Sequence, residues 1–204
     1  MWVPRVYLVS DRRLAADLPA VVRAALVGLP PRTAAVQLRE KDLPARDLLE
    51  LGRALRRVCA GAGQALLVND RIDVALAAGA DGVHLPADGV PPAEARRLLG
   101  PGRLVAVSCH GAAEVALALR QGADFATFGP VFDTPSKRPW GPPLGLERLR
   151  QAVAMGLPLL GLGGIDAARA AEVRAAGAAG VGAIRAWLEA ADPAAAVRSL
   201  AGLP

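Results

Sequence analysis

Five residues of types that are uncommon in this chain carry most of the chemistry that its sequence offers. The chain has only two lysines, Lys41 and Lys137, two histidines, His84 and His110, and a single asparagine, Asn69. Where a composition discourages a residue type, a position that keeps it has a local chemical reason to do so. Ammonium, imidazole and amide groups bind anions and move protons, so these residues indicate an enzyme that acts on a charged small molecule.

The segment from Val36 to Lys41 alternates with the period of two that is typical of a β-strand. Gln37, Arg39 and Lys41 therefore point to the same side of the strand end. An amide, a planar guanidinium fork and an ammonium that converge on one point suit a pyrophosphate. The alternative is an ordinary strand edge at which Glu40 forms a salt bridge.

Asn69 and Asp70 follow a short apolar run and precede a helical pattern. At such a turn an amide can contact a ligand, and a carboxylate can bind Mg²⁺, which prefers oxygen ligands. Alternatively, Asp70 only caps the helix and Asp73 pairs with Arg71. Both interpretations stay open, and the neighbouring pyrophosphate site favours the metal.

Two further kinds of segment offer anion-binding groups. The long loop over residues 128–141 carries the hydroxyls of Thr134 and Ser136 and the amine of Lys137, which can hold and cover an anionic substrate. Glycine-rich turns at residues 161–166 and in the 180–185 stretch precede two helical patterns, where backbone N–H groups bind phosphate. The sequence therefore predicts a pyrophosphate site and a separate monophosphate site.

The elements that must position these groups alternate along the whole chain. Predicted strands cover Arg5–Val9, Ala34–Arg39, Leu66–Val68, Gly82–His84, Leu104–Val107, Phe125–Phe128, Pro158–Gly161 and Gly180–Gly182. Predicted helices cover Leu18–Val27, Ala45–Ala62, Arg71–Ala78, Pro92–Leu99, Ala112–Gln121, Leu146–Ala154, Ala167–Ala176 and Ala183–Leu200.

Eight strand–helix units predict the α/β class and one closed (β/α)8 TIM barrel over residues 1–204. The alternative is an open, doubly wound sheet. Against that alternative, Ser10, Asp11 and Arg12 follow the first strand in place of a glycine-rich dinucleotide turn. In a barrel the carboxyl ends of all strands meet at one mouth, and the five uncommon residues all lie at such ends.

Composition excludes several other functions. The net charge is +5, but the arginines are scattered and only 3% of residues are aromatic, so we expect no nucleic-acid partner. No apolar run reaches the roughly 18 residues of a membrane span, and the first residues lack a signal-peptide pattern. The two cysteines, Cys59 and Cys109, are too few for a disulfide framework and lack metal-ligand spacing. We therefore expect a soluble, cytoplasmic protein with no membrane partner.

In their order along the chain, these motifs resemble the thiamine-phosphate synthase superfamily, which includes the TenI-like thiazole tautomerases. The matching stretches are residues 7–11, 36–41, 68–71, 80–85, 128–137 and 163–165. The resemblance implies a TIM barrel. It also implies an Mg²⁺-assisted reaction that joins hydroxymethylpyrimidine diphosphate to thiazole phosphate and releases pyrophosphate.

The resemblance also implies roles for single residues. It places Gln37, Arg39 and Lys41 on the pyrophosphate, Asn69 on the pyrimidine or pyrophosphate, and Asp70 on Mg²⁺. It places Ser108 near the pyrimidine, and Thr134, Ser136 and Lys137 between the thiazole phosphate and the leaving group. Gly164 and the turn at Ile184 and Arg185 would take the thiazole phosphate. Lys137, Ser108 and His110 are the candidate catalytic residues.

The chain departs from the synthase pattern after the fourth strand and in the last turn. Gly89 occupies the position of a second metal-binding aspartate, Asp88 lies one residue early, and Arg185 replaces a small hydroxyl residue. The Mg²⁺ site is therefore expected to be weak or dependent on pyrophosphate. Arg185 would strengthen phosphate binding or crowd the pocket.

The alternative functions are a TenI-like tautomerase and a non-catalytic paralogue that binds a thiamine intermediate. A tautomerase needs a base, yet Pro130 stands where its usual histidine would lie, which leaves His110 to supply one. For His84 we expect a barrel-end residue bonded to backbone, and for Cys109 simple packing. A homodimer is an open alternative for the assembly.

Overall fold

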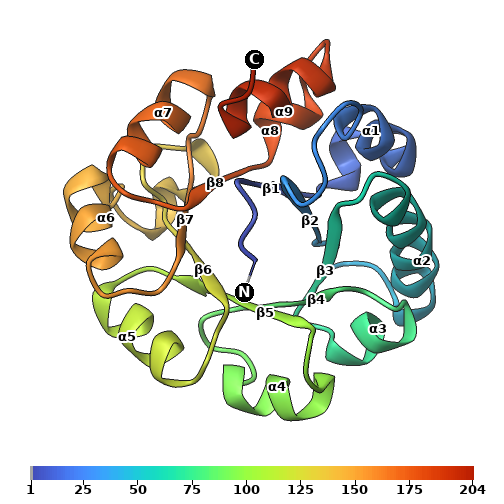
Figure 1. The fold of residues 1–204 in the computed structure, drawn as a ribbon, viewed down its shortest axis with the longest axis horizontal. Helices are drawn as coiled ribbons and strands as arrows, with labels where there is room; N and C mark the ends of the chain where they lie inside the picture. Colours follow the sequence, from blue (N-terminus) through green and yellow to red (C-terminus); the bar gives the residue numbers. More distant parts are fainter. Residues whose placement is uncertain (1) are drawn as a thin grey trace.

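The computed structural model describes residues 2–204, apart from the side chains of Ser136 and Trp140. Its parallel strands close into a barrel in the order β1-β2-β3-β4-β5-β6-β7-β8, surrounded by helices (Figure 1). The strands are β1 (Val6–Val9), β2 (Ala34–Leu38), β3 (Ala65–Asn69), β4 (Gly82–Leu85), β5 (Leu104–Cys109), β6 (Phe125–Phe128), β7 (Leu159–Leu162) and β8 (Gly180–Ala183). The predicted (β/α)8 barrel is confirmed, and the open sheet is excluded because β1 pairs with β8.

The helices of the outer ring follow the strands. They are α1 (Leu18–Ala25), α2 (Ala45–Gly61), α3 (Ile72–Ala77), α4 (Pro92–Leu99), α5 (Ala112–Arg120), α6 (Gly145–Val153), α7 (Ala167–Ala175), α8 (Arg185–Leu188) and α9 (Pro193–Ala201). Two 3₁₀ turns that the sequence did not predict, η1 (Arg12–Leu14) and η2 (Pro135–Trp140), lie in the loops after β1 and β6. Among the described residues, no helix has the length and apolar character that a membrane span requires.

The predicted helix over Ala183–Leu200 is wrong, because the structure divides this stretch into α8 and α9. The side chain of Asp192 accepts a hydrogen bond from the backbone N–H of Ala195, and Pro193 occupies the first turn. An aspartate cap followed by proline starts a new helix, since proline lacks the N–H that would continue the preceding one. The last strand is therefore followed by two short helices.

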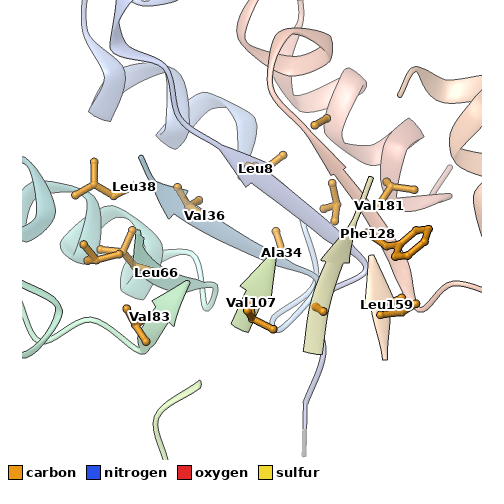
Figure 2. Packing of buried hydrophobic residues seen from close by; sticks show 14 of the residues in the cluster. Leu8, Ala34, Val36, Leu38, Leu66, Val83, Val107, Phe128, Leu159 and Val181 are labelled. Atoms are coloured by element: carbon orange, nitrogen blue, oxygen red, sulfur yellow. The ribbon is translucent and has the colours of Figure 1, made fainter. Parts of the chain in front are cut away.

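The apolar side chains form two layers because successive strand residues point to opposite faces. Leu8, Val36, Leu66 and further strand residues face outward and pack in one cluster with the helices (Figure 2). A smaller cluster fills the barrel lumen, with Tyr7, Val9, Ala35, Leu67, Ala106, Phe125 and Leu160 among its members. This alternation determines which strand-end side chains can reach the mouth of the barrel.

Aspartates fix the amino end of the barrel. The sequence repeats the phrase Gly-Ala-Asp at residues 79–81 and 122–124, each time just before a strand. Asp81 accepts the backbone N–H of Leu66 at 2.8 Å, and Asp124 accepts that of Val105 at 2.6 Å. Each aspartate also pairs with an arginine, Arg56 and Arg96 respectively. The repeat is therefore a structural device that fixes the start of the preceding strand.

Candidate functional site

Side chains from strands that are not neighbours meet inside the carboxyl half of the barrel. The Oη atom of Tyr7 on β1 lies 3.2 Å from Nδ1 of His84 on β4. The Nε2 atom of His84 lies 2.9 Å from Oγ of Ser108 on β5. Because β1 and β4 are not adjacent in the sheet, this contact crosses the lumen. Asn69 pairs in register with His84 and faces the same side, so it also points inward.

The expected backbone bond of His84 is wrong, since both ring nitrogens contact side chains instead. Burial, together with the nearby positive charge of Arg39, lowers the pKa of His84 to about 3. Burial also raises the pKa of Tyr7 well above its ordinary value. Both groups are therefore neutral at physiological pH, and neither serves as a proton donor of the kind a titrating histidine provides.

Three cations converge at the mouth. Arg39 directly follows β2, Lys41 comes two residues later, and Lys137 lies in η2 after β6. The pKa of Lys137 is lowered because its ammonium is partly buried and because Arg39 and Lys41 place like charges nearby. Within the described residues, none of the three cations has a carboxylate partner among the ion pairs. Clustered cations of this kind attract a multiply charged anion.

Glu40 lies between two of these cations but points away from them. Its carboxylate accepts hydrogen bonds from the Ser10 hydroxyl at 2.5 Å and from the backbone N–H of Arg12 at 3.1 Å. The Ser10 hydroxyl in turn accepts the backbone N–H of Arg39 at 2.8 Å. The alternative of a Glu40 salt bridge is therefore wrong: the buried carboxylate ties the β1 loop to the end of β2 and leaves the cations unpaired.

Asp70 has an exposed carboxylate on a left-handed backbone. Its φ is 64°, which is uncommon for a residue other than glycine, and its backbone N–H donates to the carbonyl of His84 at 2.8 Å. The cap interpretation is wrong, because α3 begins after Arg71 without a side-chain cap. The Arg71–Asp73 pair is present, with a 2.5 Å contact. A strained backbone that directs an unused carboxylate to solvent is typical of a ligand-binding position.

The loop after β6 is fixed at its base. Val131 donates its backbone N–H to the carbonyl of Leu162, and Leu144 donates to the carbonyl of Pro130, each at 2.8 Å. Thr134 precedes η2, and its backbone carbonyl accepts the N–H of Lys137 at 2.9 Å. The predicted side-chain role of Ser136 lies outside the described residues. The loop thus brings Lys137 over the mouth while its two ends stay on the barrel.

The glycine-rich turn after β7 fits closely under this loop. Gly163 and Gly164 both have positive φ, and a Cβ on Gly164 would lie 2.7 Å from the carbonyl oxygen of Asp133. Asp166 caps the helix that follows, since its carboxylate accepts the backbone N–H of Arg169 at 2.9 Å. A side chain at position 164 would collide with the loop after β6, so only glycine fits there. The backbone of Gly164 therefore lies close beneath that loop.

The turn after β8 carries Ile184 and Arg185 at the start of α8. The Arg185 guanidinium donates to Glu189 at 3.0 Å, one turn along the same helix, and its side chain is 73% exposed. The side chain therefore lies along the surface of α8 and does not crowd the turn.

The remaining predicted residues lie at the same end of the barrel. His110 is exposed, and its Nδ1 donates to the carbonyl of Gly129 at 2.6 Å. Asp88 is exposed, and a Cβ on Gly89 would lie 2.7 Å from the Pro86 ring. An aspartate at position 89 would therefore displace that ring. Cys109 is buried in the outer core, which confirms its packing role.

Sequence reasoning missed one residue of the site. Tyr7 is the only tyrosine of the chain, so the rarity argument that selected the lysines and histidines would have selected it too. Tyr7 lies inside an apolar strand, so no local pattern marks it as a site residue. Only the closed barrel brings it to His84.

Known proteins resemble this chain over almost all of its length. A family model described as thiamine monophosphate synthase matches residues 6–187. A protein of Geobacter sulfurreducens is 53% identical over 97% of this chain and 93% of its own length. The thiamine-phosphate synthase of Roseiflexus sp. is 47% identical over 96% of this chain and 83% of its own. The solved thiamine phosphate pyrophosphorylase from Pyrococcus furiosus superposes with a TM-score of 0.85 at 34% identity, covering 96% of this chain and 93% of its own. The resemblance predicted from the motifs is confirmed.

Proposed function

Because the chain belongs to the thiamine monophosphate synthase family, we propose that it joins hydroxymethylpyrimidine diphosphate to thiazole phosphate and releases pyrophosphate. The observation that carries the proposal is the set of three cations at the mouth, Arg39, Lys41 and Lys137, which lack carboxylate partners among the described ion pairs. The names of the relatives support the synthase over the tautomerase and the non-catalytic paralogue.

The cations act on the leaving group. As the bond between the pyrimidine methylene carbon and the diphosphate breaks, negative charge grows on the departing oxygens. Arg39 and Lys41, at the end of β2, hold the diphosphate together with Gln37, and Lys137 reaches it from the β6 loop. Preorganised positive charge stabilises this transition state because it needs no rearrangement at the moment of reaction. The ring nitrogen of the thiazole then captures the pyrimidine cation.

The rest of the mouth orients the two substrates. Ser108 and Asn69 face the lumen side of the site and contact the pyrimidine or its diphosphate. Thiazole phosphate takes the backbone N–H groups at Gly164 and in the Ile184–Arg185 turn, with Thr134 of the β6 loop nearby. Because the Arg185 side chain pairs with Glu189, this turn contributes its backbone rather than its charge. His110 lies at the rim and is a secondary group for this reaction.

The residues present fit a magnesium ion only in part. Asp70 offers one exposed carboxylate, but the described residues contain no group of three metal-ligand side chains. Asp70 would hold the ion together with oxygens of the diphosphate, and the bound ion would supply further positive charge to the leaving group. The chain itself contributes this carboxylate and the three cations at the mouth.

One assay tests the proposal. The protein is mixed with Mg²⁺, hydroxymethylpyrimidine diphosphate and thiazole phosphate, and thiamine phosphate and pyrophosphate are measured; both products are expected in equal amounts. Thiazole tautomerisation without any coupling would overturn the proposal in favour of the isomerase. Binding of thiazole phosphate without either reaction would favour the non-catalytic paralogue.

Three wider expectations belong to the same proposal. We propose that residues 1–204 form one domain and that the protein acts in the cytoplasm on small phosphorylated substrates, with a homodimer as the open alternative for its assembly. Light scattering at several protein concentrations measures the assembly directly. Cell fractionation tests the location.

A further inference from the structure

A line of hydrogen bonds leads from the centre of the barrel to its mouth. The side chain of Gln37 lies close enough to the hydroxyl of Tyr7 to lower its pKa, and this hydroxyl lies 3.2 Å from Nδ1 of His84. Nε2 of His84 lies 2.9 Å from Oγ of Ser108. Gln37, Tyr7 and His84 are buried, whereas Ser108 is half-buried at the rim. The line therefore ends on Ser108, its most exposed member, which a ligand in the mouth can touch.

Packing keeps the two rings of this line in place. The rings of Tyr7 and His84 are stacked with centroids 5.5 Å apart, and Phe125 meets Tyr7 edge-on at 5.6 Å. No buried side-chain nitrogen or oxygen in the described part of the chain lacks a hydrogen-bond partner. The rings cannot turn without breaking these contacts, so their orientation is fixed. Which group donates in each hydrogen bond therefore depends on the acidity and the lone pairs of the groups.

A neutral imidazole has one N–H donor and one lone pair, so only one of the two hydroxyls can donate to His84. A phenol such as that of Tyr7 is intrinsically a much stronger acid than an aliphatic alcohol such as that of Ser108. The phenol therefore donates to Nδ1, and Nε2 carries the proton and donates to Oγ of Ser108. The amide of Gln37 completes the line by donating to the Tyr7 oxygen.

We propose that Tyr7 and His84 are positioning residues that hold the Ser108 hydroxyl as a hydrogen-bond donor toward the mouth of the barrel. Since Oγ accepts the imidazole N–H, its own proton points to the ligand. The ligand atom above Ser108 must then carry a lone pair, as an unprotonated nitrogen of a heteroaromatic ring does. A ring N–H at that point meets a second donor and is rejected.

The identity of that ring, the pyrimidine, rests on the proposed function, but the direction of the hydrogen bonds does not. The first experiment therefore uses the protein without substrate. Long-range ¹H–¹⁵N spectra distinguish the protonated from the unprotonated nitrogen of each imidazole. The chain has only two histidines, and the exposed His110 is assigned by its loss in His110→Gln. We expect His84 to carry its proton on Nε2; a proton on Nδ1 would overturn the proposal.

Tyr7→Phe removes the phenol proton without removing the ring. Ser108 then becomes the only hydroxyl beside His84 and donates to Nε2, so the imidazole proton is expected to move to Nδ1. The matched control is Phe125→Leu, which disturbs the same packing but takes no part in the hydrogen bonds, and should leave the proton on Nε2. An unchanged His84 spectrum in Tyr7→Phe would overturn the positioning role. If Tyr7→Phe does not fold, the wild-type spectrum still decides the direction.

The second experiment asks what the Ser108 hydroxyl recognises. Analogues of the pyrimidine diphosphate, in which each ring nitrogen is replaced in turn by C–H, are compared with the natural compound by direct binding. One analogue is expected to bind about tenfold more weakly to the wild type. Ser108→Ala and Tyr7→Phe should lose this discrimination, whereas Phe125→Leu should keep it. Equal binding of all analogues to the wild type would overturn the ligand part of the proposal.

The two experiments separate this proposal from the proposed function. Discrimination between ring analogues together with an absence of thiamine phosphate would support the positioning role and overturn the synthase. Synthesis of thiamine phosphate by a protein with the His84 proton on Nδ1 would support the synthase and overturn the positioning role.

Discussion

The two ends of the barrel use the same kinds of charged side chain in opposite ways. At the amino end, Asp81 and Asp124 each bind a backbone N–H and pair with an arginine. At the carboxyl end, Arg39, Lys41 and Lys137 have no carboxylate partner among the described ion pairs. The paired charges at the amino end hold the strands in register. The unpaired charges at the carboxyl end are, on the proposed function, the groups that bind the ligand. Substitutions at the two ends should therefore fail in different assays.

The largest expected effect is a loss of activity at the mouth. Arg39→Ala and Lys41→Ala should each lower synthase activity by more than tenfold, and by about a hundredfold where the cation stabilises the leaving group. The free energy of unfolding should hardly change, because partly exposed, unpaired cations contribute little to stability. Steady-state kinetics and urea unfolding measure the two effects. If the variants lose stability and keep their activity while folded, the two residues have a structural role and not a catalytic one.

The reciprocal effect is expected at the amino end. Arg96→Ala leaves the mostly buried carboxylate of Asp124 without its partner, and should lower the free energy of unfolding by about 1–3 kcal/mol. Synthase activity at a permissive temperature should stay unchanged. Arg97→Ala is the matched control on the same helix, since its pair with Glu94 is exposed. A loss of activity in folded Arg96→Ala would remove the contrast between the two ends.

A metal measurement sharpens the contrast further, because the mouth combines many cations with few carboxylates. Calorimetry should show negligible Mg²⁺ binding to the protein alone and at least tenfold tighter binding with pyrophosphate present. Asp70→Asn should abolish the second effect, and Asp88→Asn should not. Tight binding of Mg²⁺ to the protein without pyrophosphate would mean that Asp88 or another carboxylate completes the site.

The smallest expected effect is a change in proton balance. The pKa of Lys137 is lowered by burial and by its cationic neighbours, and a bound polyanion favours the charged amine, so binding raises that pKa again. Pyrophosphate binding should therefore take up a fraction of a proton as the pH approaches the ordinary lysine value of about 10.4. Calorimetry in two buffers of different ionisation enthalpy measures this uptake. Lys137→Arg, which keeps its charge, should lack it, and equal uptake by both proteins would contradict the assignment.

Sequence patterns predicted the barrel because each strand and helix carries its own local signal. Apolar alternation marks β2, and Asp166 marks the start of α7. The ends of a helix are harder to predict where the helical composition of a stretch competes with a cap inside it. The helical composition around residues 183–200 concealed the cap at Asp192, so α8 and α9 were merged.

The site was predictable only where its residues are close in sequence. Gln37 lies in β2, and Arg39 and Lys41 follow it closely, so chain connectivity alone keeps the three near one strand end. The line from Tyr7 through His84 to Ser108 joins residues far apart in the chain, and no local pattern predicts it. It exists because barrel closure brings three strands around one lumen, which is a property of the whole fold.

The scarcity of lysine gives the mouth a chemical signature. Lys41 and Lys137 are the only side-chain amines of the chain, and both lie where the pyrophosphate is expected. Since only an unprotonated amine attacks an acylating reagent, the lowered pKa makes Lys137 the faster to be modified. The arginine side chains elsewhere do not react with such reagents. After digestion, mass spectrometry of a briefly acylated sample therefore reads the state of the site from the marks on its two lysines and from their protection by bound anion.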